Sequence, residues 1–179
     1  MVSQRELHQD THSWTIALRS VLREDPDVVV IGEMRDYDTV QAAITVAETG
    51  HLVFATLHTS TTPEAINRMI DVFPANQQNQ IRSQLSSVLR AVIAQRLLPT
   101  ADNSTRVPAV EILINTPAVA ALIREGKFFM LDNIIETSED AGMVIFEKYL
   151  AKLYSEGKIT REIAESYALR ANEVKKFIQ

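Results

Sequence analysis

Residues 25–36 read Asp-Pro-Asp-Val-Val-Val-Ile-Gly-Glu-Met-Arg-Asp, a run that predicts a buried strand followed by a carboxylate. The four consecutive β-branched residues at positions 28–31 are typical of a strand buried on both faces of a parallel sheet. Glu33 follows just beyond the end of this strand. Because ligands gather at the carboxyl ends of parallel strands, a carboxylate here can reach a metal ion bound to phosphate.

A second segment, residues 49–59, reads Thr-Gly-His-Leu-Val-Phe-Ala-Thr-Leu-His-Thr and predicts a strand over 52–57. The apolar spacing before it predicts a helix over 38–48, which Gly50 ends. Strand, helix and strand with short connections predict a parallel βαβ unit. Glu33 and His58 then lie just past the carboxyl ends of its two strands.

The glycine-rich loop that cradles phosphate, G-x-x-x-x-G-K-S/T, does not occur in the 179 residues. The chain has only five glycines, widely separated, so no other phosphate-cradling loop can be assembled. The two segments therefore predict one half of an ATPase site, in a fragment of a motor or in a degenerate motor.

Composition narrows the class of protein. An apolar fraction of 46% with 23% charged residues is typical of a globular protein, and the absence of cysteine excludes disulfides and thiolate metal sites. The net charge of −5 offers no basic footprint, so nucleic acid is not an expected partner. No apolar run approaches the roughly 18 residues of a membrane span, and we expect a cytoplasmic chain without one.

The remaining elements are mostly helical. Helices are predicted after Ser13, from a Thr62 cap to about residue 72, and after the Thr116 and Thr160 caps, the last through residue 169. Two more are expected over 128–135 and 144–154. A strand over 107–114 is expected to pair with Leu97 and Leu98. One long amphipathic helix after Pro74 is predicted from its apolar positions: Ile81, Leu85, Val88, Leu89, Val92 and Ile93.

The candidate site residues differ in how well a purely structural role would explain them. Glu33 suits a metal or water role, but a surface carboxylate in a turn gives the same pattern. His58 can donate a hydrogen bond to a γ-phosphate oxygen, whereas His51 is better explained by a structural hydrogen bond. Seven residues of strand place the two histidines roughly 23 Å apart, so they do not share a metal. Arg35, adjacent to Glu33, is a candidate organiser of the site.

The motifs together resemble those of the PilT-type ATPases, hexameric motors that retract type IV pili, within the secretion ATPase superfamily. Residues 31–36 are similar to the Walker B segment of that family, and residues 49–59 resemble its His box. Residues 67–71 and 95–98 fit as well. The resemblance implies an α/β fold, with a partial RecA-like parallel sheet over residues 1–115 and a C-terminal helical bundle over 116–179.

The resemblance also implies ATP and Mg²⁺ as cofactors and assigns roles to residues. Glu33 is expected to be catalytic and to bind Mg²⁺ through water; the expected nucleotide and phosphate contacts are Gly32, Arg35, His58 and Thr59; His51 is a structural member of the His box. The family's AIRNLIRE motif reads AVAALIRE over residues 118–125. Its expected coupling residues are Leu122, Ile123, Arg124 and Glu125.

Family members further imply a homo-hexamer, an inner-membrane pilus platform protein as partner, and a cytoplasmic location peripheral to the inner membrane. Complete members carry a PAS-like domain, the Walker A loop and an acidic motif upstream. We therefore expect this chain to be the C-terminal half of such a motor and to be inactive alone.

Two alternatives remain open. Extension and type II secretion ATPases usually insert a tetracysteine zinc module, which a chain without cysteine lacks, so retraction is favoured. The paralogue PilU and a type II secretion ATPase remain alternative identifications within the same superfamily. A different class is a non-catalytic interaction module, in which the C-terminal helices dock on pilus or secretion machinery.

Overall fold

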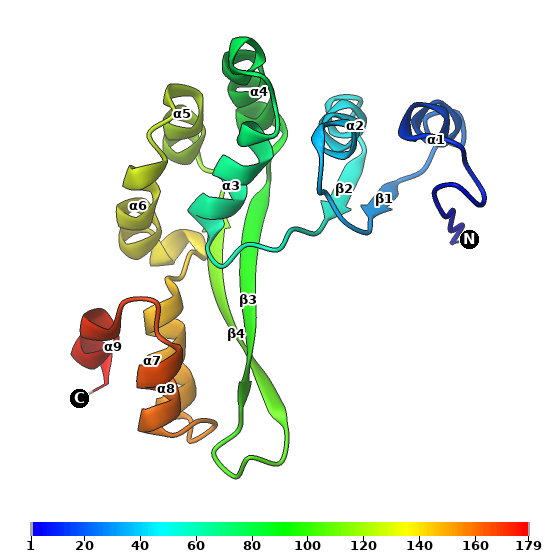
Figure 1. Cartoon of the computed structure of the whole chain (residues 1–179). Coiled ribbons are helices and arrows are strands. Elements are labelled where there is room, and N and C mark those ends of the chain that lie inside the picture. Colours follow the sequence, from blue (N-terminus) through cyan, green and yellow to red (C-terminus); the bar gives the residue numbers. More distant parts are fainter. Residues whose placement is uncertain (1, 179) are drawn as a thin grey trace. The chain divides into compact units, whose positions relative to one another are not determined.

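The computed structural model describes residues 2–178, without the side chains of residues 15, 18 and 19. It is a mixed α/β structure with a small parallel sheet and an antiparallel hairpin (Figure 1), which confirms the predicted fold class. The chain forms two compact units, residues 2–58 with 68–88 and residues 59–67 with 89–178. The functional division expected at residue 115 stays a prediction.

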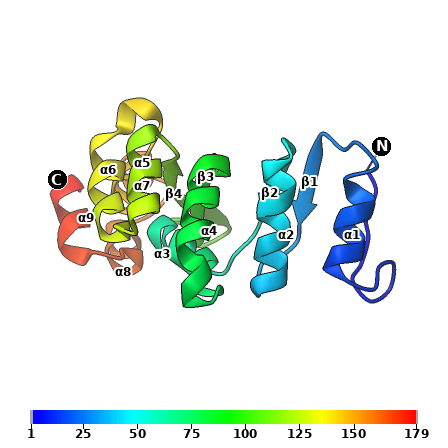
Figure 2. The same ribbon diagram turned by 90° about the horizontal axis from the view of Figure 1, so that it is seen from above.

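The first unit contains the expected βαβ arrangement. Strands β1 (Val28–Ile31) and β2 (Leu52–Ala55) pair in parallel, and α2 (Tyr37–Glu48) connects them and packs against β2 (Figure 2). The α2 N-terminus is capped by the Asp36 carboxylate, which accepts a hydrogen bond from the Thr39 amide at 3.0 Å. Gly50 follows the helix with φ +96°, a conformation that favours glycine.

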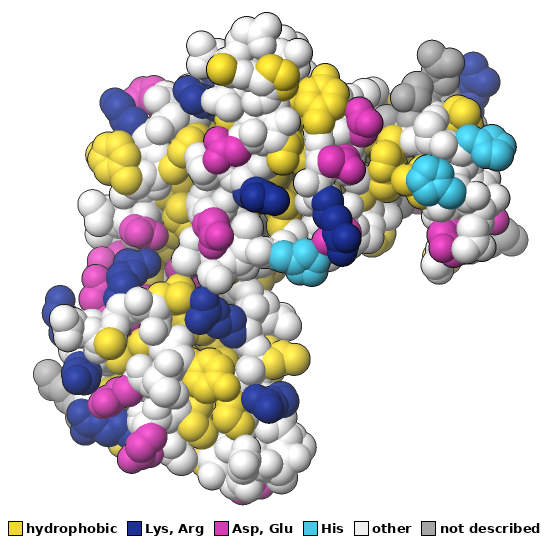
Figure 3. Space-filling model, in the orientation of Figure 1, with side chains coloured by type: hydrophobic (Ala, Val, Ile, Leu, Met, Phe, Trp, Pro, Cys, Tyr) yellow, Lys and Arg dark blue, Asp and Glu magenta, His cyan; other side chains and the backbone are white. Residues whose placement is uncertain are grey.

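β1 was predicted to be buried on both faces, and this is wrong. Val30 is 71% exposed and its neighbour across the sheet, Phe54, is 57% exposed; Val28 and Leu52 are exposed on the same face. Apolar side chains are visible at the surface over β1 and β2 (Figure 3). The reason is that, among residues 2–178, β1 pairs with β2 alone and α2 contacts the sheet from the other face.

This apolar face predicts self-association of the purified chain, because an exposed edge strand with an apolar face is a site of pairing between copies. We expect light scattering to show concentration-dependent oligomers. Val30→Lys should shift the chain toward monomer, whereas Gln80→Lys, at an exposed position of the same unit, should not. A monodisperse wild-type monomer at high concentration would contradict the prediction.

Of the other helices of the first unit, the one after Ser13 agrees with its prediction, whereas the helix predicted after Pro74 is shorter than expected because its last residues form a strand. α1 (Trp14–Val21) begins after the Ser13 cap as predicted. The helix expected to continue through Ile93 ends instead at Val88, where α4 (Ala75–Val88) stops. The apolar residues beyond it fit both periods, but the β-branched pair Val92 and Ile93 alternates between the two faces of a strand.

That strand, β3 (Ala91–Pro99), forms the hairpin of the second unit with β4 (Arg106–Ile114). Leu98 lies opposite Val107, so the predicted pairing is confirmed, and it extends along the full length of both strands. Pairing over this length stabilises the strand conformation of residues that could also have been helical.

Helices complete the second unit. Thr116 and Thr160 cap α5 and α8 as predicted, whereas Thr62 is not a cap: Thr61 caps α3 (Thr62–Asp71), and its hydroxyl accepts from the Glu64 amide. Tyr167, not Leu169, ends α8, and a further short helix, α9, follows. The bounds are α5 (Pro117–Glu125), η1 (Phe128–Met130), α6 (Leu131–Thr137), η2 (Glu139–Ala141), α7 (Phe146–Ser155), α8 (Arg161–Tyr167) and α9 (Ala171–Phe177).

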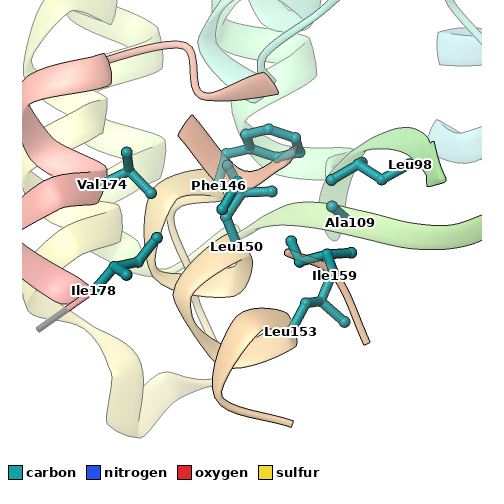
Figure 4. Close-up of a cluster of buried hydrophobic side chains, with 9 residues drawn as sticks. Leu98, Ala109, Phe146, Leu150, Leu153, Ile159, Val174 and Ile178 are labelled. Carbon is teal, nitrogen blue, oxygen red and sulfur yellow. The ribbon is translucent and has the colours of Figure 1, made fainter. Parts of the chain in front are cut away.

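The core of the second unit lies between the hairpin and α7, α8 and α9 (Figure 4). Leu98 and Ala109 reach it from the two strands, and Val174 and Ile178 reach it from the chain's last helix and the residue after it. These helices therefore pack on the hairpin to form one body. None of the helices in the described part of the chain is long and apolar enough to cross a membrane.

Candidate functional site

The two strands of the parallel sheet are held together beyond their ends. The Met34 amide donates to the Thr56 carbonyl at 3.0 Å, and the Thr56 hydroxyl donates to the Gly32 carbonyl. These bonds extend the pairing past β1 and β2. The two hydrogen bonds hold the backbone on both sides of Glu33, at Gly32 and at Met34, next to Thr56, two residues before His58.

The structure brings three expected site residues into one cluster. Glu33 Oε1 lies 2.5 Å from Arg35 Nε and 2.6 Å from His58 Nε2. The Glu33 side chain is 26% exposed and its Oε1 atom is buried, whereas Arg35 and His58 are 73% and 79% exposed. The carboxylate therefore sits beneath two side chains that open to solvent, at the carboxyl edge of the sheet.

The cluster is electrostatically polarised. The contact with the Arg35 side chain and its charge lower the pKa of Glu33, partial desolvation opposes this, and the His58 ring lowers it further. The same contact raises the pKa of Arg35. Glu33 is therefore negatively charged at neutral pH, which suits a group that attracts a hydrated cation.

The lowered pKa of Glu33 predicts a pH-dependent contribution to stability. The charged cluster is favourable above the ordinary glutamate pKa of about 4.3, and the contribution is lost as the pH falls through the lowered folded value. Melting curves of the wild-type chain and of Glu33→Gln should differ at pH 7 and converge only once the pH has fallen below the lowered pKa of Glu33. A difference that persists unchanged in acid would contradict this assignment.

The other expected contacts are placed differently. Gly32 is exposed, and a Cβ added there would meet nothing within 4 Å, so folding of this chain does not require glycine at that position. Thr59 is half-buried and begins the other compact unit. His51 lies at the amino end of β2, where its Nδ1 contacts the Thr49 hydroxyl at 2.9 Å.

Glu33 can supply one of the ligands that a protein-bound Mg²⁺ ion normally has. Magnesium keeps several waters and is usually held by one or two carboxylates together with substrate phosphates. Within residues 2–178, no three histidine, cysteine or carboxylate side chains gather into a metal site, but Glu33 supplies one ionised carboxylate. These residues could orient a hydrated ion that is held mainly by a nucleotide.

The expected coupling residues lie on and beside one helix face. Ile123 is fully buried with Val119, and Leu122 is half-buried. Arg124 is exposed, and Glu125 forms an ion pair with Lys127 at 2.7 Å that lowers the pKa of Glu125. α5 therefore contains an anchoring side and an accessible charged side.

Sequence reasoning missed two buried glutamates in the second unit. Glu111 in β4 accepts from Thr62, and Glu147 in α7 accepts from the Arg170 amide at 2.9 Å; both are fully buried. A signal for Glu111 was present. It occupies an inward position of β4 between Ala109 and Leu113, where an apolar residue is normal.

Comparisons with known proteins agree with the motifs. A family model described as type II/IV secretion system protein matches residues 3–168. The chain is 47% identical over 168 residues to the type IV pilus retraction ATPase PilT of Pseudomonas aeruginosa, covering 94% of this chain and 48% of that protein. It is 42% identical over 179 residues to the pilus ATPase PilU of the same organism, covering 100% of this chain and 47% of that protein.

A crystal structure of the pilus retraction motor PilT with bound ADP matches with a TM-score of 0.87 and 45% identity, covering 98% of this chain and 49% of that one. The chain thus spans about half the length of these relatives. The resemblance inferred from residues 31–36 and 49–59 is confirmed. The chain belongs to the type II/IV secretion system protein family.

Proposed function

We propose that this chain is the Walker B and His-box half of a PilT-type ATPase that retracts type IV pili. The observation that supports this most strongly is the contact of Glu33 with both Arg35 and His58 at the carboxyl edge of a parallel sheet. Nucleotides bind at such edges in α/β folds. The similarity to a retraction ATPase and to an ADP-bound motor gives the direction of the proposal.

In this proposal Glu33 is the catalytic residue. When MgATP is bound, Mg²⁺ supplies charge stabilisation to the phosphates. Glu33, whose lowered pKa keeps it negatively charged at neutral pH, would help hold the hydrated ion and would orient the attacking water. Arg35 holds the Glu33 carboxylate in place, and Gly32 leaves the backbone open to a close ligand.

His58 has a different proposed role, that of a sensor. Its Nε2 contacts Glu33 Oε1 at 2.6 Å and the ring is otherwise largely exposed. A γ-phosphate oxygen would compete with Glu33 for this ring nitrogen, so the His58 contact would depend on which nucleotide is bound. Thr59 follows directly in the chain and is proposed to contact the same phosphate. His51, at the other end of β2, is proposed to be structural.

The proposal extends to assembly and location. We propose a homo-oligomer, a hexamer as in the family, in which the half absent from this chain supplies the phosphate-binding loop. We further propose that α5 transmits the motion to an inner-membrane pilus platform protein, from a cytoplasmic position at that membrane. PilU-like retraction is a second candidate, favoured by the similarity to PilU over all 179 residues of this chain.

The test uses a chimera in which this chain replaces the matching half of the Pseudomonas aeruginosa PilT, called the chimera below. We expect the purified chimera to hydrolyse ATP and to restore twitching in a strain that lacks its own PilT. Hydrolysis without twitching would favour the PilU-like candidate. A folded chimera without hydrolysis would overturn the proposal and favour a non-catalytic interaction module.

A further inference from the structure

Glu111 makes an unusual pair of contacts for a residue in the middle of a strand. Its Oε1 accepts a hydrogen bond from the Thr62 amide at 2.8 Å and another from the Thr62 hydroxyl at 2.9 Å. Both residues are fully buried, and both belong to the second compact unit. A carboxyl group is costly to bury, and its bonds to the two donors offset that cost.

The segment that Glu111 holds is itself a rigid turn. The Thr61 hydroxyl accepts from the Glu64 amide at 3.2 Å, and Glu64 Oε2 accepts from the Ser60 amide at 2.8 Å. The Thr61 carbonyl also accepts the first helical bond, from Ala65, at 3.1 Å. Residues 60–65 therefore form one hydrogen-bonded body, and Glu111 attaches that body to β4.

This turn directly follows the His box in the chain. His58 precedes Ser60 by two residues, and two residues span at most about 7 Å when fully extended. The anchored turn therefore begins within two residues of the end of the His box.

The strand that carries Glu111 also leads to α5. Beyond its end, the Asn115 amide donates to the Arg90 carbonyl at 2.9 Å and its side chain donates to the Leu89 carbonyl at 2.8 Å. The next residue, Thr116, is the cap of α5. β4 therefore has two attachments. Glu111 binds the turn that follows the His box, and Asn115, just before α5, binds the backbone that precedes β3.

We propose that Glu111 is a positioning residue for the turn that follows the His box: its buried carboxylate anchors Thr62 and so holds residues 60–65 on β4, and ATP hydrolysis by the complete protein depends on this anchor. The expected effect on ATP hydrolysis rests on the proposed function. The hydrogen-bonded anchor between Glu111 and Thr62 does not, and it is tested by a separate measurement.

Glu147 provides a matched control. It is also fully buried, also accepts a backbone amide bond through Oε1, and also has a second oxygen without a hydrogen-bond partner. Its donor, Arg170, lies between α8 and α9, more than a hundred residues along the chain from His58. Removing either carboxylate should destabilise the second unit, but only the loss of Glu111 should release the turn that follows the His box.

The first measurement is amide hydrogen exchange on the 179-residue chain, over peptides that cover residues 57–62. Loss of a bond to a charged acceptor should accelerate exchange in Glu111→Leu about tenfold or more. Glu111→Gln should stay near wild type, because Oε1 makes both bonds and an amide retains that oxygen. Glu147→Leu should also stay near wild type in these peptides. Equal protection in Glu111→Leu would overturn the anchor.

The second measurement is ATP hydrolysis by the chimera with the same variants. Glu111→Leu should reduce kcat/KM about tenfold or more, Glu111→Gln should restore it, and Glu147→Leu should leave it near wild type at matched folded fraction. Equal loss in Glu111→Leu and Glu147→Leu would reduce Glu111 to a packing residue. Loss in Glu111→Gln equal to that in Glu111→Leu would also contradict the anchor.

Two outcomes separate this inference from the proposed function. An unsubstituted chimera without hydrolysis refutes the proposed function, while the exchange result still decides the anchor. Should Glu111→Leu not fold, Thr62→Val removes only the hydroxyl bond and keeps the amide bond. It should then accelerate exchange about threefold or more, and wild-type exchange in that variant would overturn the anchor.

Discussion

Glu33→Gln in the chimera is expected to retain ATP binding and to lose hydrolysis by about 10²-fold or more. The amide keeps the shape of the carboxylate but not the charge that orients water around the metal. The structure supports this charge directly, because Arg35 and His58 both contact Oε1 and lower the pKa of Glu33. Steady-state hydrolysis and a nucleotide titration on the same preparation measure the two quantities.

Glu156→Gln is the matched control for this substitution. Glu156 is a glutamate paired with Lys158 at 2.8 Å, and this contact also lowers its pKa, but it belongs to the second unit and not to the unit that contains Glu33. Hydrolysis in Glu156→Gln should remain near wild type. Wild-type turnover in Glu33→Gln would instead assign Glu33 to a structural role.

The second large effect concerns coupling. In the chimera, replacing Leu122 and Arg124 together by alanine should leave ATP hydrolysis within about threefold of wild type and abolish twitching, because chemistry needs the sheet edge and not α5. Arg124 is exposed and Leu122 is half-buried, whereas the helix is anchored by Val119 and Ile123. Hydrolysis, melting temperature and twitching on one set of variants test this.

Ile123→Ala provides the contrast. Ile123 is fully buried, so its truncation should cost about 2–5 kcal/mol of stability and reduce hydrolysis and twitching together. If the Leu122 and Arg124 variant behaves in the same way, with parallel loss of all three quantities, then α5 acts by packing and the coupling role is refuted.

Local signals in the sequence were sufficient to predict β1, the strand that leads to Glu33, and several helix starts and strand pairings. The β-branched run at 28–31, the caps at Thr116 and Thr160, and the hairpin pairing of Leu98 with Val107 all follow from short-range chemistry, and all are present in the structure. The approach of Glu33 to His58 follows from parallel topology, because both residues lie beyond carboxyl ends of neighbouring strands.

Errors arose where pairing or burial depends on distant residues. Val92 and Ile93 fit a helical stripe, and only the partner strand β4 decides that they are in a strand. The exposure of Val30 depends on what covers the sheet, which the run of β-branched residues does not specify. Glu111 was missed because its donor, Thr62, is far along the chain, although its inward position in β4 signals a buried carboxylate.

A calorimetric titration with MgATP, of the chain and of the chimera, tests whether this chain supplies only one part of a nucleotide site. We expect no measurable binding by the 179-residue chain, since its sequence contains no phosphate-cradling loop, and micromolar binding by the chimera. Micromolar binding by the chain alone would contradict the account.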